Sequence, residues 1–333
     1  MKDEGNKMSE ITVIIPAYNA EKYIGECLQS LHSQTFNDMD VLVINDSSTD
    51  ETVQVVEEFQ KKHPKFMLRI ITVPNGGAAK ARNTGIRMAR GNYIAFMDAD
   101  DVADSNMLKA MIDVAHQENA DLVTCDFFWM YPNKNVRQML YSPKNNRELY
   151  TAAWAAPWNK LYRRTMLVDH DVFFTEGYTY EDTSFYLKYI PYCNIVKHIA
   201  RPFIYWRQHS TSTMGKNQDK RIPQIFLVLN DAINYYKKQG CYQEYESELE
   251  YFCAKLLWGS SIYRICQVRD TTERKKYISM TLDWLRENFP DWKKNVKFKT
   301  GVRGIYMRSI NVITANIYAN CIYYIRYFGR EKM

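Results

Sequence analysis

The sequence has few cysteines, and no two of them form a closely spaced pair. Seven cysteines are scattered over 333 residues without a C-x-x-C motif. Disulfide-stapled secreted domains and structural zinc sites both need cysteines at short, paired spacings, so these two classes are excluded. We therefore expect buried free thiols in a reducing compartment, which favours a cytoplasmic location.

The chain also lacks a clean hydrophobic run. Residues 1–9 are polar and charged, so we expect a flexible N-terminus and no secretory signal there. The best candidate for a membrane segment, residues 309–325, contains three asparagines and is flanked by Arg308 and Arg326. A bilayer span needs about 20 predominantly apolar residues, and this segment does not provide them.

That segment has the pattern of an amphipathic helix instead. Its apolar residues recur at helical spacing, at Ile310, Ile313, Ile317, Cys321, Tyr324 and Phe328. One interpretation is a helix that packs this stripe on the protein's own core. The other is a helix that lies in the headgroup plane of a membrane, with residues 305–328 on an anionic surface. The pattern alone leaves both open.

The net charge of the chain is small, and the excess of basic residues is unevenly distributed along the sequence. The net charge is +6, and no nucleic-acid-binding motif is present, so we expect no nucleic-acid partner. From Lys255 onward 16 basic and 6 acidic side chains give +10, and the preceding residues carry −4. A basic C-terminal region on a slightly acidic body indicates that this region alone meets an anionic surface.

The first half of the chain alternates regularly between strand and helix patterns. Short apolar runs at 11–15, 41–44, 68–73 and 93–97 are each followed by a segment with helical spacing. This rhythm predicts an α/β fold with a mostly parallel sheet and helices on both faces. Beyond residue 221 the pattern is helical throughout, which predicts a C-terminal helical region.

Polar side chains follow these apolar runs where each predicted strand ends. Tyr18 and Asn19 follow the first run, Asp46 follows the second, and Asp98 and Asp100 follow the fourth. Ligands of parallel α/β sheets bind beyond the carboxyl ends of the strands. This edge of the sheet is therefore the candidate site.

The two carboxylates after the fourth run suggest a cation. At spacing i, i+2 on an extended strand end, Asp98 and Asp100 lie on one side. Two unpaired carboxylates so close repel each other unless a cation lies between them, and Mg²⁺ or Mn²⁺ suits oxygen ligands. The alternative is that Asp100 and Asp101 cap the helix expected from Ser105, or face water.

Four sequence motifs occur in order along the first third of the chain. They are IIPAYN at 14–19, NDSSTD at 45–50, NGG at 75–77 with ARNTG at 81–85, and FMDADD at 96–101. Together they resemble the nucleotide-binding half of a GT-A glycosyltransferase of family 2. The resemblance is dense over residues 10–130 and continues thinly, through WNKLY at 158–162 and YWRQH at 205–209, to about residue 215. Many relatives have Gly where this chain has Ser47 and Asp where it has Asn45, which changes the turn but keeps Asp46.

The resemblance implies a nucleotide site at the ends of the first strands. Pro16 and Ala17 would bracket the nucleobase, and Tyr18 would stack on it. Asp46 would accept a hydrogen bond from a uracil N–H, which favours UDP, and Arg82 would reach the nucleotide or its phosphates. The residues by themselves also allow a helix N-cap for Asp46 and a surface salt bridge for Arg82.

The resemblance also implies a metal site and a catalytic base. Asp100 and His209 would hold Mn²⁺ or Mg²⁺, and Asp98 would touch the metal or the ribose, although a purely structural histidine is equally open. Asp182 would take the proton of the acceptor hydroxyl, with Glu181 as the second choice. The alternative is that this acidic pair caps the helix expected from residue 183. Trp158 would line the acceptor side, and family 2 enzymes invert the anomeric configuration.

These features combine into one hypothesis with three regions. Residues 10–130 would bind the nucleotide sugar, residues 131–215 the acceptor, and residues 216–333 would form the helical region with a basic amphipathic tail. The function would be metal-dependent transfer of a sugar from a UDP-sugar to a glycan or lipid-linked glycan, in cell-surface polysaccharide synthesis. The protein would be cytoplasmic or peripheral on the inner face of the plasma membrane.

Two other functions stay in competition. A nucleotidyltransferase shares the α/β plan and the acidic metal site, but it is expected to carry a Gly-rich loop after the first strand, where this chain has Pro16, Ala17 and Tyr18. A nucleotide- or glycan-binding protein with a decayed site is the third reading. The joint presence of Asp98, Asp100 and Asp182 argues against decay.

Overall fold

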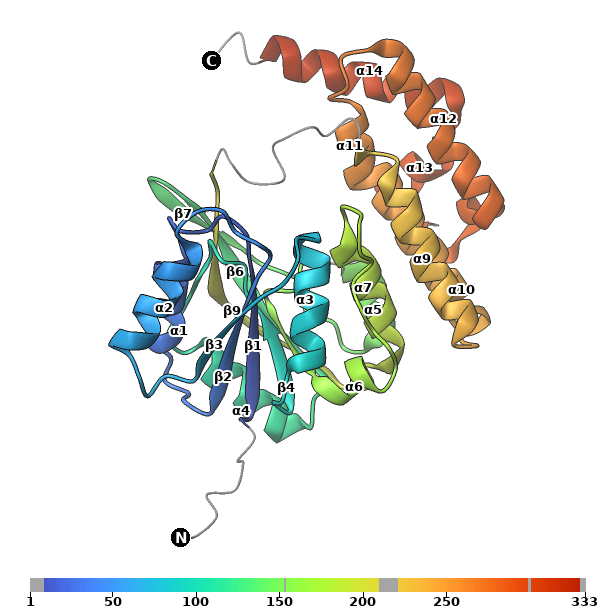
Figure 1. Ribbon diagram of the computed structural model, residues 1–333. Helices are drawn as coiled ribbons and strands as arrows, with labels where there is room; N and C mark the ends of the chain where they lie inside the picture. Colours follow the sequence, from blue (N-terminus) through green and yellow to red (C-terminus); the bar gives the residue numbers. More distant parts are fainter. Residues whose placement is uncertain (1–8, 153, 210–220, 299–300, 330–333) are drawn as a thin grey trace. The chain divides into compact units, whose positions relative to one another are not determined.

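The computed structural model describes residues 9–152, 154–209, 221–298 and 301–329 (Figure 1). Its contacts divide the chain into two compact units, Met1–Ser210 and Thr211–Met333. The predicted flexible N-terminus lies, except for Ser9, outside the described residues, and so do residues 210–215 of the predicted acceptor region. The division of the first unit at residue 130 stays a prediction.

Unit 1 is built on a mixed β-sheet. In its described part, nine strands run in the order β3-β2-β1-β4-β8-β6-β9-β5, with β7 paired to β6. The strands are β1 (Ile11–Ala17), β2 (Met39–Asn45), β3 (Leu68–Thr72), β4 (Tyr93–Phe96), β5 (Val102–Ala103), β6 (Leu122–Tyr131), β7 (Lys134–Gln138), β8 (Lys160–Arg163) and β9 (Val196–Arg207). Strands β1 to β4 pair in parallel, as predicted. Beyond them the sheet is mixed, because β8 runs antiparallel to both β4 and β6, and β5 runs antiparallel to β9.

Helices cover both faces of this sheet, as predicted (Figure 1). The apolar sides of α1, α2 and α4 share one core with the inward side chains of β1 and β2, and α3 packs Ala81 on Leu42 of the other face. A Cβ at Gly85 of α3 would come within 2.3 Å of Ile14 Cγ2, so this close approach of helix to strand requires glycine. The helices of unit 1 are α1 (Ile24–His32), α2 (Thr52–Lys62), α3 (Gly77–Met88), α4 (Met107–Glu118), α5 (Asn146–Ala152), α6 (Arg164–Val168), α7 (Glu181–Tyr189) and a 3₁₀ turn, η1 (Ile190–Tyr192).

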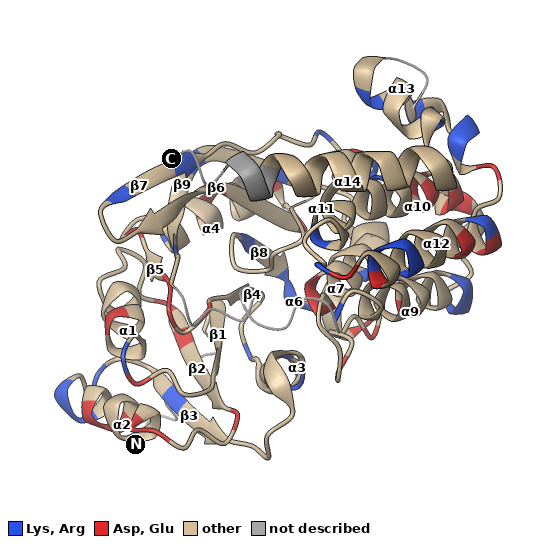
Figure 2. Ribbon diagram, turned by 90° about the horizontal axis from the view of Figure 1, so that it is seen from above, with Lys and Arg blue, Asp and Glu red and all other residues tan. Residues whose placement is uncertain are grey.

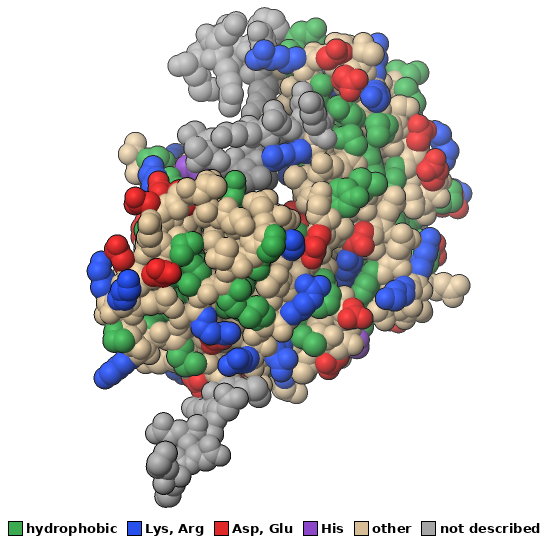
Figure 3. Space-filling view, in the orientation of Figure 1, with side chains coloured by type: hydrophobic (Ala, Val, Ile, Leu, Met, Phe, Trp, Pro, Cys, Tyr) green, Lys and Arg blue, Asp and Glu red, His purple; other side chains and the backbone are tan. Residues whose placement is uncertain are grey.

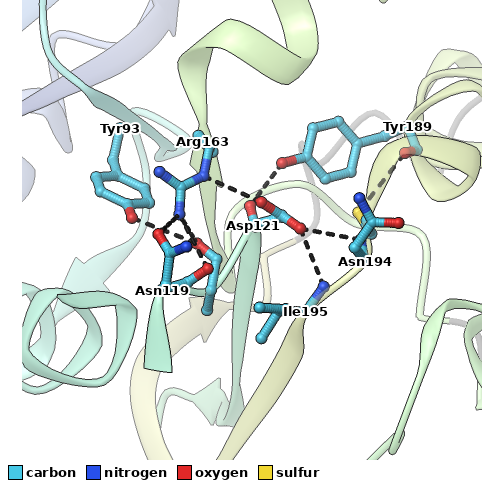
Figure 4. A network of polar contacts seen from close by, with 9 residues as sticks. Tyr93, Asn119, Asp121, Arg163, Tyr189, Asn194 and Ile195 are labelled. Atoms are coloured by element: carbon cyan, nitrogen blue, oxygen red, sulfur yellow. Dashed lines mark hydrogen bonds and ion pairs between the residues drawn. The ribbon is translucent and has the colours of Figure 1, made fainter. Parts of the chain in front are cut away.

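A buried polar network ties the strands together at the end of the sheet opposite to the candidate site (Figure 4). The Asp121 carboxylate accepts from Arg163 Nε at 3.0 Å. It also accepts from the backbone N–H groups of Asn194 and Ile195, at 2.9 and 3.0 Å. The Tyr189 hydroxyl donates to the Asp121 carbonyl at 2.6 Å. Because its charges are paired with one another and with backbone groups, this cluster is a structural tie between β6, β8 and the start of β9.

Unit 2 is helical, as predicted. Its elements are α9 (Gln224–Lys238), α10 (Tyr242–Leu256), η3 (Leu257–Ser261), α11 (Ile262–Ile265), α12 (Thr271–Asn288), the 3₁₀ turns η4 (Trp292–Lys294) and η5 (Val296–Phe298), α13 (Gly301–Ser309) and α14 (Val312–Gly329). The pattern over 245–265 predicts one helix; the structure divides it by a π-helical stretch, η3. Among the described residues, no helix is long and apolar enough to cross a membrane. All seven cysteines are free and five are buried, as predicted, whereas Cys241 is half-buried and Cys321 is exposed.

Candidate active site

The acidic motif lies at the carboxyl end of β4, beside the end of β9. Asp98 and Asp100 follow the last residue of β4, and Asp100 Oδ2 is 2.7 Å from His209 Nε2. Burial and the nearby Asp98 raise the pKa of Asp100, and the hydrogen bond with His209 opposes this shift. The structure therefore brings together two predicted metal ligands that are far apart in the sequence.

Two further residues hold the end of β9 against the acidic loop. Asp101 is buried and accepts from the Arg207 backbone N–H at 2.9 Å, and Arg207 Nε donates to the Asp100 carbonyl at 2.8 Å. These bonds place His209, two residues after Arg207, beside Asp100. The interpretation that Asp100 and Asp101 cap the following helix is therefore wrong, because their carboxylates face β9 and His209. Arg207 was not predicted as a site residue, although it stands in the YWRQH motif.

A second charged cluster joins α3, the end of β4 and the start of α7 through Arg82. Its Nη2 is 2.8 Å from Asp98 Oδ1. Its Nη1 is 3.0 Å from Glu181 Oε1 and 3.2 Å from Asp182 Oδ1. The Arg82 side chain is 6% exposed and the three carboxylate side chains are 18–32% exposed, so the interpretation of a surface salt bridge is wrong. The predicted contact of Arg82 with a nucleotide stays a prediction.

The neighbour of Arg82 fixes the segment that leads into α7. The Asn83 side chain donates to the Phe174 carbonyl at 2.9 Å and to Glu176 Oε1 at 2.8 Å, and accepts from the Phe174 N–H at 2.8 Å. Arg82 and Asn83, consecutive residues of α3, therefore bind the acidic pair at the start of α7 and the segment that leads into this helix. Asn83 was missed as a site residue, although the ARNTG motif contains it.

The surroundings of Asp182 favour its protonated form. Burial raises the pKa of Asp182 to about 8; Arg82 opposes this shift, and the negative charges of Glu181 and Asp98 add to it. The Lys160 charge also opposes it. A carboxylate with a raised pKa that remains partly open to solvent is suited to accept a proton near neutral pH.

Lys160 is a buried cation next to α7, the helix that begins with the acidic pair. Its Nζ lies 2.7 Å from each of three oxygens: the carbonyls of Trp154 and Ala156, and the Asn159 side-chain oxygen. Burial lowers the pKa of Lys160 to about 7, against the opposing negative charge of Asp182. Lys160 therefore holds together the loop before β8, and its charge acts on Asp182.

Trp158 lies inside an aromatic cluster. It is 4% exposed, and its ring centroid is 4.8 Å from that of Phe127 and 5.4 Å from that of Trp206. In this arrangement Trp158 packs against the half-buried Trp206. Its predicted contact with the acceptor stays a prediction.

Asp46 holds the turn that begins α3. Its two carboxylate oxygens accept from the N–H groups of Gly76 and Gly77, each at 2.8 Å. The carboxylate therefore lies at the start of α3 and does not cap α2, the helix that follows it in sequence. Pro16 and Ala17 end β1 next to β2, and Tyr18 is exposed beyond them. The predicted nucleobase contacts of these residues stay predictions.

Ser47 has a backbone conformation that glycine adopts without strain. Its φ is +57°, a left-handed conformation that costs a non-glycine residue about 1–2 kcal/mol. Its Oγ donates to the Val73 carbonyl at 2.7 Å, a bond worth about 0.5–1.5 kcal/mol. The two effects nearly cancel.

We therefore expect Ser47→Gly to change the free energy of unfolding by less than about 1 kcal/mol, as measured by urea denaturation. Ser47→Val serves as the matched variant. A β-branched side chain at positive φ is a strong outlier, so a loss of about 2 kcal/mol or more is expected. Equal stability of both variants would contradict this account of the turn.

The donor types at the acidic loop fit a divalent cation. In the described part of the chain, no group of three or more His, Cys, Asp or Glu side chains is arranged to hold a metal ion. Asp100 and His209 are in contact, and Asp98 is turned to Arg82. Buried Asp101 Oδ2 has no hydrogen-bond partner among the described residues. Carboxylate oxygens with one imidazole suit Mn²⁺ better than Mg²⁺, which prefers oxygen alone.

Comparison with known proteins agrees with the geometry. The family model of glycosyl transferase family 2 matches residues 12–179. The uncharacterized glycosyltransferase EpsJ of Bacillus subtilis is 31% identical over 216 residues, which cover 61% of this chain and 62% of EpsJ. The chain thus spans just under two thirds of that relative. The putative glycosyltransferase EpsH of the same organism is 28% identical over 280 residues, which cover 80% of each chain.

A solved structure shows the same fold. The crystal structure of S. aureus TarS 1–349 in complex with UDP-GlcNAc matches with a TM-score of 0.73 and 23% identity, over 96% of this chain and 92% of that one. The predicted GT-A fold with a C-terminal helical region is confirmed. The family model covers half of the chain, including strand β4 and the acidic loop that follows it. The chain therefore belongs to glycosyl transferase family 2 and is a glycosyltransferase.

Proposed function

We propose that this protein transfers a sugar from a UDP-sugar to a hydroxyl group of a glycan or lipid-linked glycan, in the synthesis of a cell-surface polysaccharide. The observation that carries the proposal is the junction of Asp98, at the carboxyl end of β4, with Asp182 at the start of α7, through one buried arginine. This junction puts the predicted donor side and the predicted base within one cluster. The TarS structure with UDP-GlcNAc supports a UDP-sugar donor and makes UDP-GlcNAc the first candidate.

In the proposed reaction Asp182 takes the proton of the acceptor hydroxyl as that oxygen attacks the anomeric carbon. Its partly exposed carboxylate and raised pKa suit this step. Glu181 and Asp182 share one guanidinium nitrogen of Arg82, so Arg82 orients the base. Attack opposite to the leaving diphosphate in a single displacement inverts the configuration, giving a β-linkage from an α-linked donor.

Metal dependence is part of the same proposal. Asp100 and His209 would hold Mn²⁺, with Asp98 turning from Arg82 to the metal or to the ribose. When bound, the metal would supply positive charge that offsets the negative charge developing on the departing diphosphate. Asp101 and Arg207 hold the end of β9, and with it His209, beside Asp100.

The proposed location follows from the substrates. Scattered free thiols agree with a reducing compartment, and a cytoplasmic enzyme that uses a lipid-linked acceptor works at the inner face of the plasma membrane. We therefore propose a cytoplasmic protein that acts at that face.

A donor screen tests the proposal. UDP-Glc, UDP-Gal, UDP-GlcNAc and UDP-GalNAc are offered to the full chain with Mn²⁺, and released UDP is measured. We expect one donor to be hydrolysed or transferred. Turnover of UTP without any of these reactions would favour the nucleotidyltransferase, and absence of UDP binding would favour a decayed site.

The metal ligands are tested by calorimetry of UDP binding with and without Mn²⁺. We expect Asp100→Asn to weaken the Mn²⁺-dependent binding about 10-fold or more. Asp113→Asn is the control, because this exposed carboxylate of α4 pairs only with Lys109 in the described contacts. Unchanged binding for Asp100→Asn would remove Asp100 from the metal site.

A further inference from the structure

Helix α14 exposes its larger apolar side chains and buries its smaller ones. Ala315 and Ala319 are each 1% exposed, whereas Ile313 is 72%, Ile317 52% and Tyr324 56% exposed. At 3.6 residues per turn, the exposed three lie on the side of the helix opposite to the alanines. A surface helix of a globular protein normally has the reverse arrangement. The interpretation that this stripe packs on the protein's own core is therefore wrong for these residues.

Contacts inside unit 2 fix the rotation of α14. Asn320 Oδ1 accepts from Arg274 Nη2 of α12 at 2.9 Å, and the Arg274 guanidinium lies 4.6 Å from the centroid of the Tyr323 ring. The Tyr318 hydroxyl is 3.0 Å from Ser309 Oγ at the end of α13. These contacts hold α14 on α12 and α13, and with Ala315 and Ala319 buried against the unit, Ile313 and Ile317 stay exposed.

The preceding helix extends the apolar surface. In α13, Gly304 and Met307 are buried, whereas Val302 and Ile305 are strongly exposed. We call the exposed apolar residues of both helices the α13–α14 surface; they are Val302, Ile305, Val312, Ile313, Ile317, Tyr324 and Ile325. Figure 3 shows hydrophobic side chains open on the helices of this unit. Large apolar side chains exposed in this number on two successive helices indicate an interaction site.

The sequence that contains this surface is strongly basic. Residues 292–333 contain nine Lys and Arg and a single acidic residue, Glu331. In Figure 2 the described part of α14 between 312 and 325 carries no charged side chain, and basic residues lie on α13 and the segment before it. An uncharged apolar helix with basic neighbours complements an anionic surface that has an apolar interior.

We propose that the α13–α14 surface lies on an anionic lipid membrane, with α14 parallel to the membrane and its isoleucine side in the headgroup region. The inference goes beyond the proposed reaction and does not depend on it. Exposed Tyr324 has the amphipathic ring that is enriched at membrane interfaces. A second copy of this chain would bring two basic regions together, and their repulsion disfavours that occupant.

Vesicle sedimentation of the full chain tests the proposal. We expect binding to vesicles that contain phosphatidylglycerol, and at least about tenfold weaker binding to phosphatidylcholine alone or at high salt. Ile313→Asp with Ile317→Asp is expected to reduce binding to the anionic vesicles about tenfold or more. The matched control is Leu227→Asp, an exposed apolar position on α9, which should bind like the unmodified chain. Equal binding by the double variant and the control would overturn the proposal.

A second measurement does not rely on substitutions in the surface. Cys321 is the exposed thiol among the seven cysteines, and an environment-sensitive fluorophore on it reports the polarity around α14. With half-buried Cys241 changed to Ser, we expect a blue shift and quenching by lipids spin-labelled near the headgroup when anionic vesicles are added. An unchanged spectrum would overturn the proposal. A blue shift that grows with protein concentration in the absence of lipid would also overturn it, in favour of a second copy of the chain.

Discussion

Replacing Asp182 by Asn is expected to lower kcat about 10³-fold while UDP binding stays nearly unchanged. A positioned general base contributes about 10²–10⁴-fold to such reactions, and Asn keeps the size and the acceptor oxygen that faces Arg82 but cannot take the proton. The carboxylate lies at the start of α7, where its side chain is partly exposed. Steady-state release of UDP in the presence of acceptor, together with calorimetry of UDP binding, measures both quantities.

Glu181→Gln is the matched control for this prediction. Both carboxylates bind the same Arg82 nitrogen, at 3.0 and 3.2 Å, so both amide variants disturb the ion cluster in a similar way. If Asp182 is the base, Glu181→Gln should lose about tenfold or less. A larger loss of kcat for Glu181→Gln than for Asp182→Asn would mean that Glu181 is the base and Asp182 is not.

The pH dependence of the reaction follows from the same residue. The pKa of Asp182 is raised to about 8 by burial, with Arg82 opposing the shift. A base works in its deprotonated form, so activity should be low below this pKa and rise with pH through it, reaching a plateau above. We expect kcat/KM to fall tenfold per pH unit on the acidic side. An acidic limb near the usual carboxylate pKa of about 4 would contradict the burial of this base.

The first half of the fold could be predicted because its signals are local. Buried parallel strands are continuous apolar runs, and the crossover helices between them show apolar side chains at helical spacing. Strands β1 to β4 were predicted on this basis, and the acidic loop was placed at the correct edge of the sheet. Strands β7 and β8 were missed, because β7 is exposed and polar and β8 is a short strand without an apolar run.

The connections within the site could not be predicted, because they join residues distant in sequence. The motifs supplied Arg82 and Asp182 separately, but nothing in either segment shows that the guanidinium is buried against Asp98 and the acidic pair. Similarly, the helical spacing of Ile313 and Ile317 identified a stripe, yet only the docking of Ala315 and Ala319 decides that the stripe faces outward. Spacing gives the face of a helix; tertiary contacts decide which face is covered.

Replacing Arg82 by Met is expected to damage stability and activity together, and to move the pH profile. Three carboxylates would lose their shared cation. We expect a loss of about 1–3 kcal/mol in the free energy of unfolding, below the 3–5 kcal/mol of a fully buried pair, because the carboxylates remain partly open to water. Loss of orientation of the base should lower kcat about 10²-fold or more.

The pH profile separates a positioning role from a merely structural one. Without Arg82 only the weaker effect of Lys160 opposes the negative charges of Glu181 and Asp98 on Asp182, so the acidic limb should move to higher pH by about one unit or more. Arg82→Lys keeps the positive charge but not the forked guanidinium that reaches both Asp98 and the acidic pair. Compared with Arg82→Met, it should restore most of the pH profile and only part of kcat. An unchanged acidic limb in Arg82→Met, measured on protein shown to be folded by circular dichroism, would mean that Arg82 only holds the fold and that another group sets the protonation of the base.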